Sequence, residues 1–102
     1  MERRRFEEQL NALPAKPGVY LFRDASGNVL YVGKGANLYH RVRSYFTAPH
    51  ALSPKLHRMV SRVKEFEFFV TDSEQEALIL ECNLIKKHRP RYNCLLYTSD
   101  AA

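Results

Sequence analysis

Two short apolar segments with a turn between them set the strongest constraint on how this chain can fold. The first contains Gly18-Val19-Tyr20 and the second, eleven positions further on, contains Tyr31-Val32-Gly33. Both segments are rich in β-branched and aromatic residues, which favours the two strands of a hairpin. A turn over residues 24–27 would place Tyr20 directly opposite Tyr31. Opposed aromatic side chains usually only pack against each other, so a catalytic role for this pair needs support from other segments.

The other segments predict helices around one more strand. Residues 66–71 have the composition of a strand. Apolar residues at helical spacing, together with capping residues and prolines, predict helices over about residues 6–13, 38–45, 54–63 and 74–88. With 102 residues, 45% of them hydrophobic, the chain is long enough for one modest core. We therefore expect the α+β class: a small, mainly antiparallel three-stranded sheet flanked by helices, in one domain over residues 1–93.

Charge is distributed in blocks along the chain. The sequence has 16 Lys and Arg against 11 Asp and Glu, which gives a net charge of +5. No acidic residue lies between Asp24 and Glu65, whereas residues 65–85 contain no Lys or Arg. A basic block is either a solvated face or a surface for phosphates, and the second interpretation makes DNA the expected partner. The candidate DNA contacts in this block are Arg43, Lys55, Arg58 and Arg62.

Several kinds of site and location are not expected. Cys82 and Cys94 have neither a CxxC spacing nor neighbouring ligands, so we interpret both as reduced thiols and expect no zinc. No apolar run approaches the length of a membrane span, and Met1 is followed by charged residues rather than by the apolar core of a signal peptide. The expected location is the cytoplasm, with no membrane partner.

Glu81 is the acidic residue with the most unusual predicted environment. On a helical wheel it falls in the middle of an apolar arc formed by Ala77, Leu78, Leu84 and Ile85. A carboxylate there loses solvation and remains charged only beside a cation, a metal ion or strong hydrogen-bond donors. A buried ion pair, or a side chain that reaches past the rim, is one interpretation. The other is a ligand for a hard divalent cation, which prefers oxygen donors.

Cationic groups are expected beside the hairpin. Arg41 lies at the edge of the apolar stripe of the helix that follows, where it either packs through its stem or holds a phosphate with two parallel donors. Lys34, just past Tyr31, is able to reach the same place. Phenols, cations and one carboxylate together suit phosphodiester hydrolysis. In that reaction, neighbouring cations would lower the pKa of a tyrosine from its usual value of about 10, so that it helps to deprotonate the attacking water.

These residues resemble the GIY-YIG nuclease family. The likeness is carried by Gly18-Val19-Tyr20, Tyr31-Val32-Gly33, Lys34, Asn37-Leu38, Arg41-Val42 and Ser44-Tyr45-Phe46. Residues 76–93 are more specifically similar to the N-terminal domain of the UvrC family, the endonuclease subunits of bacterial nucleotide excision repair. The likeness covers roughly residues 12–93, and the run over residues 83–93 is its most specific part.

The resemblance implies a function and a set of roles. The function is that of a metal-dependent DNA endonuclease that makes the incision on the 3′ side of a lesion, with UvrA and UvrB as partners that choose the strand. A single magnesium or manganese ion would be bound by Glu81, while Arg41 would stabilise the phosphoryl charge. Tyr31 would assist the activation of water, with Tyr20 in support. Further residues implied in or around the cleft are Lys34, Tyr45, Gly33, Asn37 and Asn93.

A non-catalytic DNA-binding or partner-docking module of the same fold is the alternative, because the basic block alone would serve it. Arg41 and Glu81 favour the nuclease, since a binding module has no need of a carboxylate in an apolar arc. Full-length relatives carry further segments, so we expect this chain to make at most one of the two repair cuts. Residues 94–102 do not resemble the polar, lysine-bearing strand with which relatives continue, and our hypothesis is that they are foreign to the original gene.

Overall fold

The computed structural model describes residues 2–93, with the side chains of residues 6–48 and 50–93. The hypothesis about residues 94–102 lies outside these described residues, as does Cys94. The elements follow in the order α1 (Glu2–Asn11), β1 (Gly18–Arg23), β2 (Val29–Gly35), α2 (Leu38–Thr47), the short 3-10 helix η1 (Pro49–Ala51), α3 (Pro54–Arg62), β3 (Glu65–Val70) and α4 (Glu74–His88). No helix in this part of the chain is long and apolar enough to cross a membrane.

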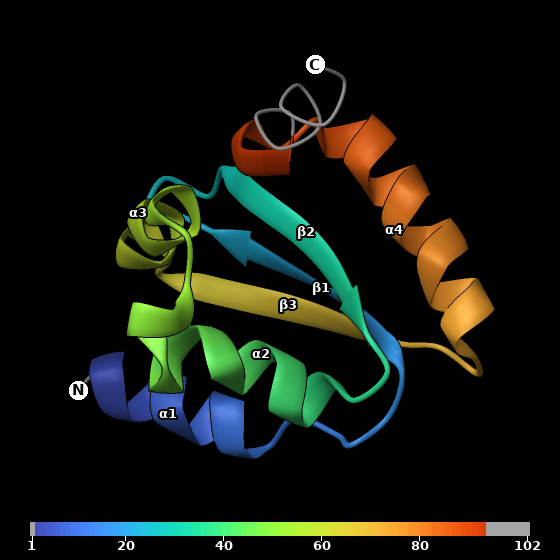
Figure 1. Ribbon diagram of the computed structural model, residues 1–102, viewed down its shortest axis with the longest axis horizontal. Helices are drawn as coiled ribbons and strands as arrows, with labels where there is room; N and C mark the ends of the chain where they lie inside the picture. Colours follow the sequence, from blue (N-terminus) through green and yellow to red (C-terminus); the bar gives the residue numbers. More distant parts are fainter. Residues whose placement is uncertain (1, 94–102) are drawn as a thin grey trace.

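The three strands form one antiparallel sheet in the order β2-β1-β3, so β1 is central and β2 is an edge strand. Figure 1 shows α1, α2 and α3 on one side of this sheet and α4 on the other. Because side chains alternate along a strand, β1 contributes to both cores. Tyr20 and Phe22 pack with α1 to α3, whereas Val19 and Leu21 pack under α4 with Ala77. The predicted α+β class with a three-stranded sheet is confirmed.

The predicted register of the hairpin is wrong. Tyr20 lies opposite Gly33, and Tyr31 lies opposite Phe22. The connection is longer than a four-residue turn, and the carboxylate of Asp24 holds it by accepting hydrogen bonds from two backbone N–H groups of the loop. The register shifts by one further residue between Phe22 and Arg23. The two phenol rings are therefore diagonal neighbours on the same face of the sheet, with their centroids 6.4 Å apart.

The buried side of α4 differs from its predicted apolar arc at one position. Ala77 is fully buried against the sheet, and Leu80, Leu84 and Ile85 pack around it. Leu78, predicted at the centre of the arc, is instead 47% exposed. The reason is that α4 lies over β1 and the edge strand β2, so one flank of the helix has no strand beneath it.

Candidate active site

Three tyrosines from three elements meet on the α2 side of the sheet. Tyr20 of β1 and Tyr45 of α2 are buried, and their hydroxyl groups are hydrogen-bonded at 2.7 Å. Tyr31 of the edge strand β2 is half-buried, and its ring centroid lies 6.3 Å from that of Tyr45. The three rings therefore form a triangle, with centroids 5.8–6.4 Å apart, and Tyr31 is the phenol that solvent or a substrate can reach.

Gly33 makes room for the ring of Tyr20. A Cβ atom added at Gly33 would lie 2.4 Å from the Tyr20 hydroxyl oxygen and 2.5 Å from Cζ. Real Cβ atoms do not approach other atoms so closely, so any side chain at this position forces the buried phenol or the strand to move. This close approach explains why the second strand has a glycine two residues after its tyrosine.

We expect the substitution Gly33→Ala to lower the free energy of unfolding by about 1–3 kcal/mol, because it overpacks a buried site. Urea unfolding of the wild type and the variant measures this change. The matched control is the same substitution in a Tyr20→Leu background, where the ring is absent and the cost of Gly33→Ala is expected to shrink. An equal cost in both backgrounds would show that Gly33 is needed for some other reason.

The pKa values of the three phenols are raised, whereas the sequence predicted a lowered value. Burial is the largest cause and, with the neighbouring Tyr31, raises the pKa of Tyr20 to about 12. Burial raises the pKa values of Tyr31 and Tyr45 as well, and Arg41 lowers all three by less than burial raises them. The prediction from neighbouring cations was wrong because it left out the loss of solvation. At neutral pH the phenols are protonated hydrogen-bonding groups.

These raised pKa values predict a fold that loses stability in alkali. The folded-state pKa of Tyr20 lies above its unfolded value of about 10, so its contribution to stability is complete below pH 10 and is lost as the pH rises toward about 12. Absorbance at 295 nm, which follows tyrosine ionisation, should rise together with the loss of the far-ultraviolet circular dichroism signal. Ionisation of all tyrosines near pH 10 with the fold intact would contradict the buried cluster.

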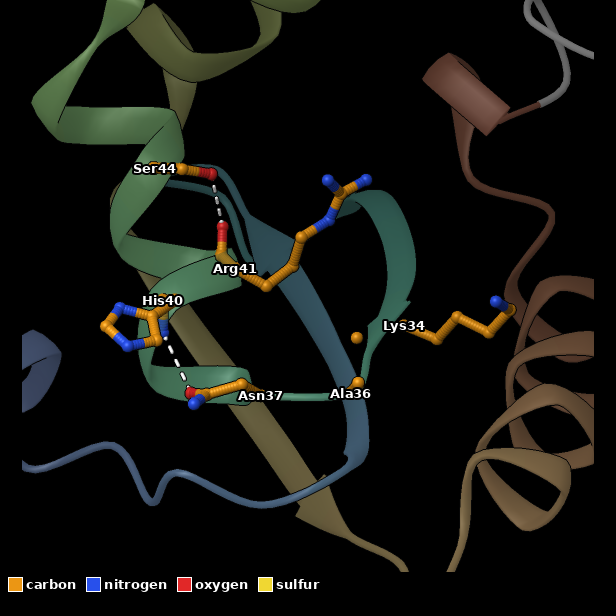
Figure 2. A pocket seen from close by; sticks show the side chains of 7 residues that line it. Lys34, Ala36, Asn37, His40, Arg41 and Ser44 are labelled. Carbon is orange, nitrogen blue, oxygen red and sulfur yellow. Dashed lines mark hydrogen bonds between the residues drawn. The ribbon is translucent and has the colours of Figure 1, made fainter.

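Two cations lie on either side of β2. Arg41 extends from α2 toward this strand, and its Cζ atom is 5.7 Å from the centroid of the Tyr45 ring. Lys34 extends from the end of β2 toward α4 (Figure 2), as its pairing with Val19 under α4 requires. A cavity of about 470 Å³ lies where β2 connects to α2; the residues that line it include Lys34, Ala36, Asn37, His40, Arg41 and Ser44.

His40 and Ser44 were not predicted as site residues, although both line this cavity. The Asn37 side chain caps α2 by accepting a hydrogen bond from the backbone N–H of His40, and Ser44 donates one to the backbone carbonyl of Arg41. His40 could have been predicted from the sequence, because it directly precedes Arg41 and lies three residues after the predicted capping residue Asn37. Asn37 thus supports the site through the start of α2.

Glu81 approaches the same strand from the opposite face. It lies half-buried on α4, and burial raises the pKa of its carboxyl group, while Lys34 and Arg41 lower it. The charge of Glu81 also contributes to the raised pKa of Tyr31. Among the described residues, an ion pair within 4.0 Å joins Arg23 and Glu67, and none involves Glu81. The Glu81 carboxylate therefore has no cationic side chain of these residues at contact distance. Phenols and carboxylate therefore meet around the edge strand β2.

Asn93 holds this edge strand from outside the sheet. Its side-chain oxygen accepts a hydrogen bond from the backbone N–H of Val32 at 2.6 Å, and its nitrogen donates one to the Val32 carbonyl at 2.8 Å. The amide thus pairs with β2 as a neighbouring strand would, and Asn93 is itself buried. Val32 lies between Tyr31 and Gly33, so this contact positions the part of β2 that carries the site.

The four candidate DNA contacts do not lie in the cavity. Arg43 points to the far side of α2, where it donates a hydrogen bond to the side chain of Asn11 and stacks 5.0 Å from the Tyr39 ring centroid. It therefore links α2 to α1. Lys55, Arg58 and Arg62 are exposed on α3. Their contact with DNA stays a prediction.

Comparison with known proteins gives the class and then the family. The sequence model of a protein family, described as the UvrC-like GIY-YIG domain, matches residues 16–94. The crystal structure of the GIY-YIG N-terminal endonuclease domain of UvrC from Thermotoga maritima, bound to its catalytic magnesium, is similar with a TM-score of 0.75 and 39% identity, over 86% of this chain and 94% of that chain. Fold and site thus define a GIY-YIG domain.

Curated relatives agree with this class and narrow it. The UvrABC system protein C of Acetivibrio thermocellus is 57% identical over 88% of this chain, and that of Desulfitobacterium hafniense is 60% identical over 87%. The chain belongs to the UvrC-like GIY-YIG family. It spans about 14% of the length of both relatives.

Proposed function

We propose that the chain is the divalent-metal-dependent DNA endonuclease domain of a longer UvrC-like protein, in which it makes the incision on the 3′ side of a lesion. The observation that carries this proposal is the meeting of three phenols, Arg41 and Glu81 around β2 from both faces of the sheet. A module that only bound DNA would need basic side chains but no half-buried carboxylate. UvrA and UvrB as partners, and a cytoplasmic location, belong to the same proposal and rest on the family.

The donor set suits a hard divalent cation. Glu81 offers a carboxylate without a cation at contact distance among the described residues, and Mg²⁺ is commonly held by one or two carboxylates together with water. Among the side chains that the structure describes, those of residues 6–48 and 50–93, no three His, Cys, Asp or Glu gather as a metal site, and Glu81 would be the acidic ligand. When bound, Mg²⁺ or Mn²⁺ would polarise a phosphoryl oxygen and stabilise charge on the leaving group.

Each protein group then has its own task. Arg41 would hold two oxygens of the scissile phosphate with parallel donors. Tyr31, the least buried of the three phenols, would assist the activation of the attacking water by accepting a hydrogen bond from it, which a protonated phenol does through its hydroxyl oxygen. The hydrogen-bonded pair of Tyr20 and Tyr45 would support Tyr31 from behind. Lys34 would add positive charge on the α4 side.

A domain exchange tests this function in the presence of the partners. Residues 16–93 replace the corresponding domain of a full-length UvrC, and the chimera is mixed with UvrA, UvrB, Mg²⁺ and a duplex with one defined lesion. We expect a 3′ incision that a chelator stops. A chimera that joins the DNA complex in a gel-shift assay, yet makes no 3′ cut, would favour the binding-only alternative instead.

DNA contact by the basic side chains of α3 completes the proposal. Arg58 and Arg62 are exposed, and α3 lies beside the sheet on the same side as α2 (Figure 1). Such side chains bind the sugar-phosphate backbone without reading sequence, which suits an enzyme whose target is chosen by partners. Arg43 has less to offer, because its guanidinium is already held by Asn11 and Tyr39.

A further inference from the structure

The charges around Glu81 are unbalanced. The groups that favour the ionised form of Glu81 are Lys34 and Arg41, and among the described residues no other carboxylate contributes to the shift of the Glu81 pKa. One negative charge against two positive charges leaves the surroundings of Glu81 positive. A divalent cation that binds Glu81 is attracted by the carboxylate and repelled by both side chains.

We propose, on the basis of the function above, that Lys34 and Arg41 hold the affinity of Glu81 for its divalent cation low until a DNA phosphate binds beside β2, so that metal and DNA bind cooperatively. Lys34 is the stronger of the two determinants, because it lies on the α4 side of β2 and extends toward the helix that carries Glu81 (Figure 2). A phosphate brings negative charge that balances Lys34 and Arg41, and its oxygens are ligands that Mg²⁺ and Mn²⁺ prefer.

Cooperativity of this kind is reciprocal. If a DNA phosphate raises the affinity for the cation by some factor, the cation raises the affinity for DNA by the same factor. The consequence for the enzyme is that the occupancy of Glu81 by the cation is lower in the free protein than on DNA. Lys34 therefore has a role in metal binding that is separate from any contact it makes with the substrate.

The first measurement is the affinity of the free chain for Mn²⁺, followed by the electron paramagnetic resonance signal of unbound Mn²⁺ at constant ionic strength. We expect Lys34→Gln to bind Mn²⁺ about three- to tenfold more tightly than the wild type, because one repelling charge is gone. Lys34→Arg keeps the charge and should keep the low affinity. Lys64→Gln is the matched control, since Lys64 precedes β3 at the opposite end of the sheet.

The second measurement is the affinity for a fluorescent duplex of about 20 base pairs, by anisotropy, with and without Mn²⁺. The Tyr31→Phe background is chosen to slow cleavage, since Tyr31 is the group proposed to assist the attacking water. The measured quantity is the factor by which Mn²⁺ raises the affinity for DNA. We expect this factor to be about fivefold or more larger with Glu81 than in the Glu81→Gln variant, and the gain to be smaller in Lys34→Gln. Comparison with Glu81→Gln removes the effect of Mn²⁺ that binds to the DNA alone.

The outcomes separate this inference from the function on which it rests. Equal Mn²⁺ affinity of Lys34→Gln and the wild type, or equal DNA affinity with and without Mn²⁺ relative to Glu81→Gln, would overturn the inference while leaving the metal site intact. Mn²⁺ binding that Glu81→Gln does not weaken, in the presence or absence of DNA, would overturn both the metal site and the inference.

Discussion

Replacing Glu81 by glutamine is expected to reduce metal-dependent 3′ incision by a factor of about 10³ or more, because the acidic ligand is lost while the volume and hydrogen-bonding capacity are kept. The chimera described above gives the assay, with single-turnover rates at several Mg²⁺ concentrations. Glu74→Gln is the matched control: Glu74 is an exposed acidic residue in the first turn of the same helix, and its substitution should leave the rate unchanged.

The same substitution is expected to leave the fold as stable as before or slightly more stable. Burial raises the folded-state pKa of Glu81 above its unfolded value of about 4.5. Its favourable contribution to stability is therefore complete below the unfolded pKa and is lost as the pH rises through the folded one. Urea unfolding at a series of pH values should show the wild type gaining stability relative to Glu81→Gln as the pH falls. A variant that is much less stable at pH 7 would mean that Glu81 is part of a structural ion pair.

Local signals in the sequence were sufficient for the elements of the fold. Ser53 and Ser73 cap α3 and α4 through their side chains as their positions predict, and a run of β-branched and aromatic residues identifies the central strand β1. The register of the hairpin was not accessible in the same way. It depends on how the Asp24 carboxylate binds the loop backbone and on a shift beside it, and both are set by three-dimensional contacts rather than by strand composition.

The sequence pointed to the three phenols, Arg41 and Glu81, which the structure brings around β2, but it did not reveal their electrostatics. Cations near the tyrosines are visible in the sequence, whereas the burial that outweighs them is a property of the packed core. The contact of Asn93 with β2 could not be predicted from sequence patterns either. Its amide bonds to the backbone of Val32, 61 residues earlier, and no pattern within the chain indicates that pairing; only the family resemblance pointed to Asn93. Long-range contacts of this kind decide which residues form a site.

Removing the guanidinium of Arg41 is the second substitution for which we expect a large effect. Arg41→Ala should lower the single-turnover incision rate about 10²–10³-fold at saturating DNA, because a preorganised donor for the transition-state charge is lost. Arg41→Lys should recover about tenfold at most, since it keeps the charge but loses the two parallel donors. The affinity for DNA should change much less than the rate, which separates a catalytic group from a binding group.

Arg58→Ala is the matched control for this prediction, because it removes the same side chain from the exposed face of α3. It should leave the incision rate at saturating DNA unchanged, weaken DNA binding at low salt, and reduce the slope of log affinity against log salt by about one. The two arginines are thereby distinguished by which measured quantity moves. If Arg41→Ala instead behaved as Arg58→Ala does, with a normal rate and a smaller salt slope, Arg41 would be a backbone contact, and the positive charge in the transition state would have to come from Lys34.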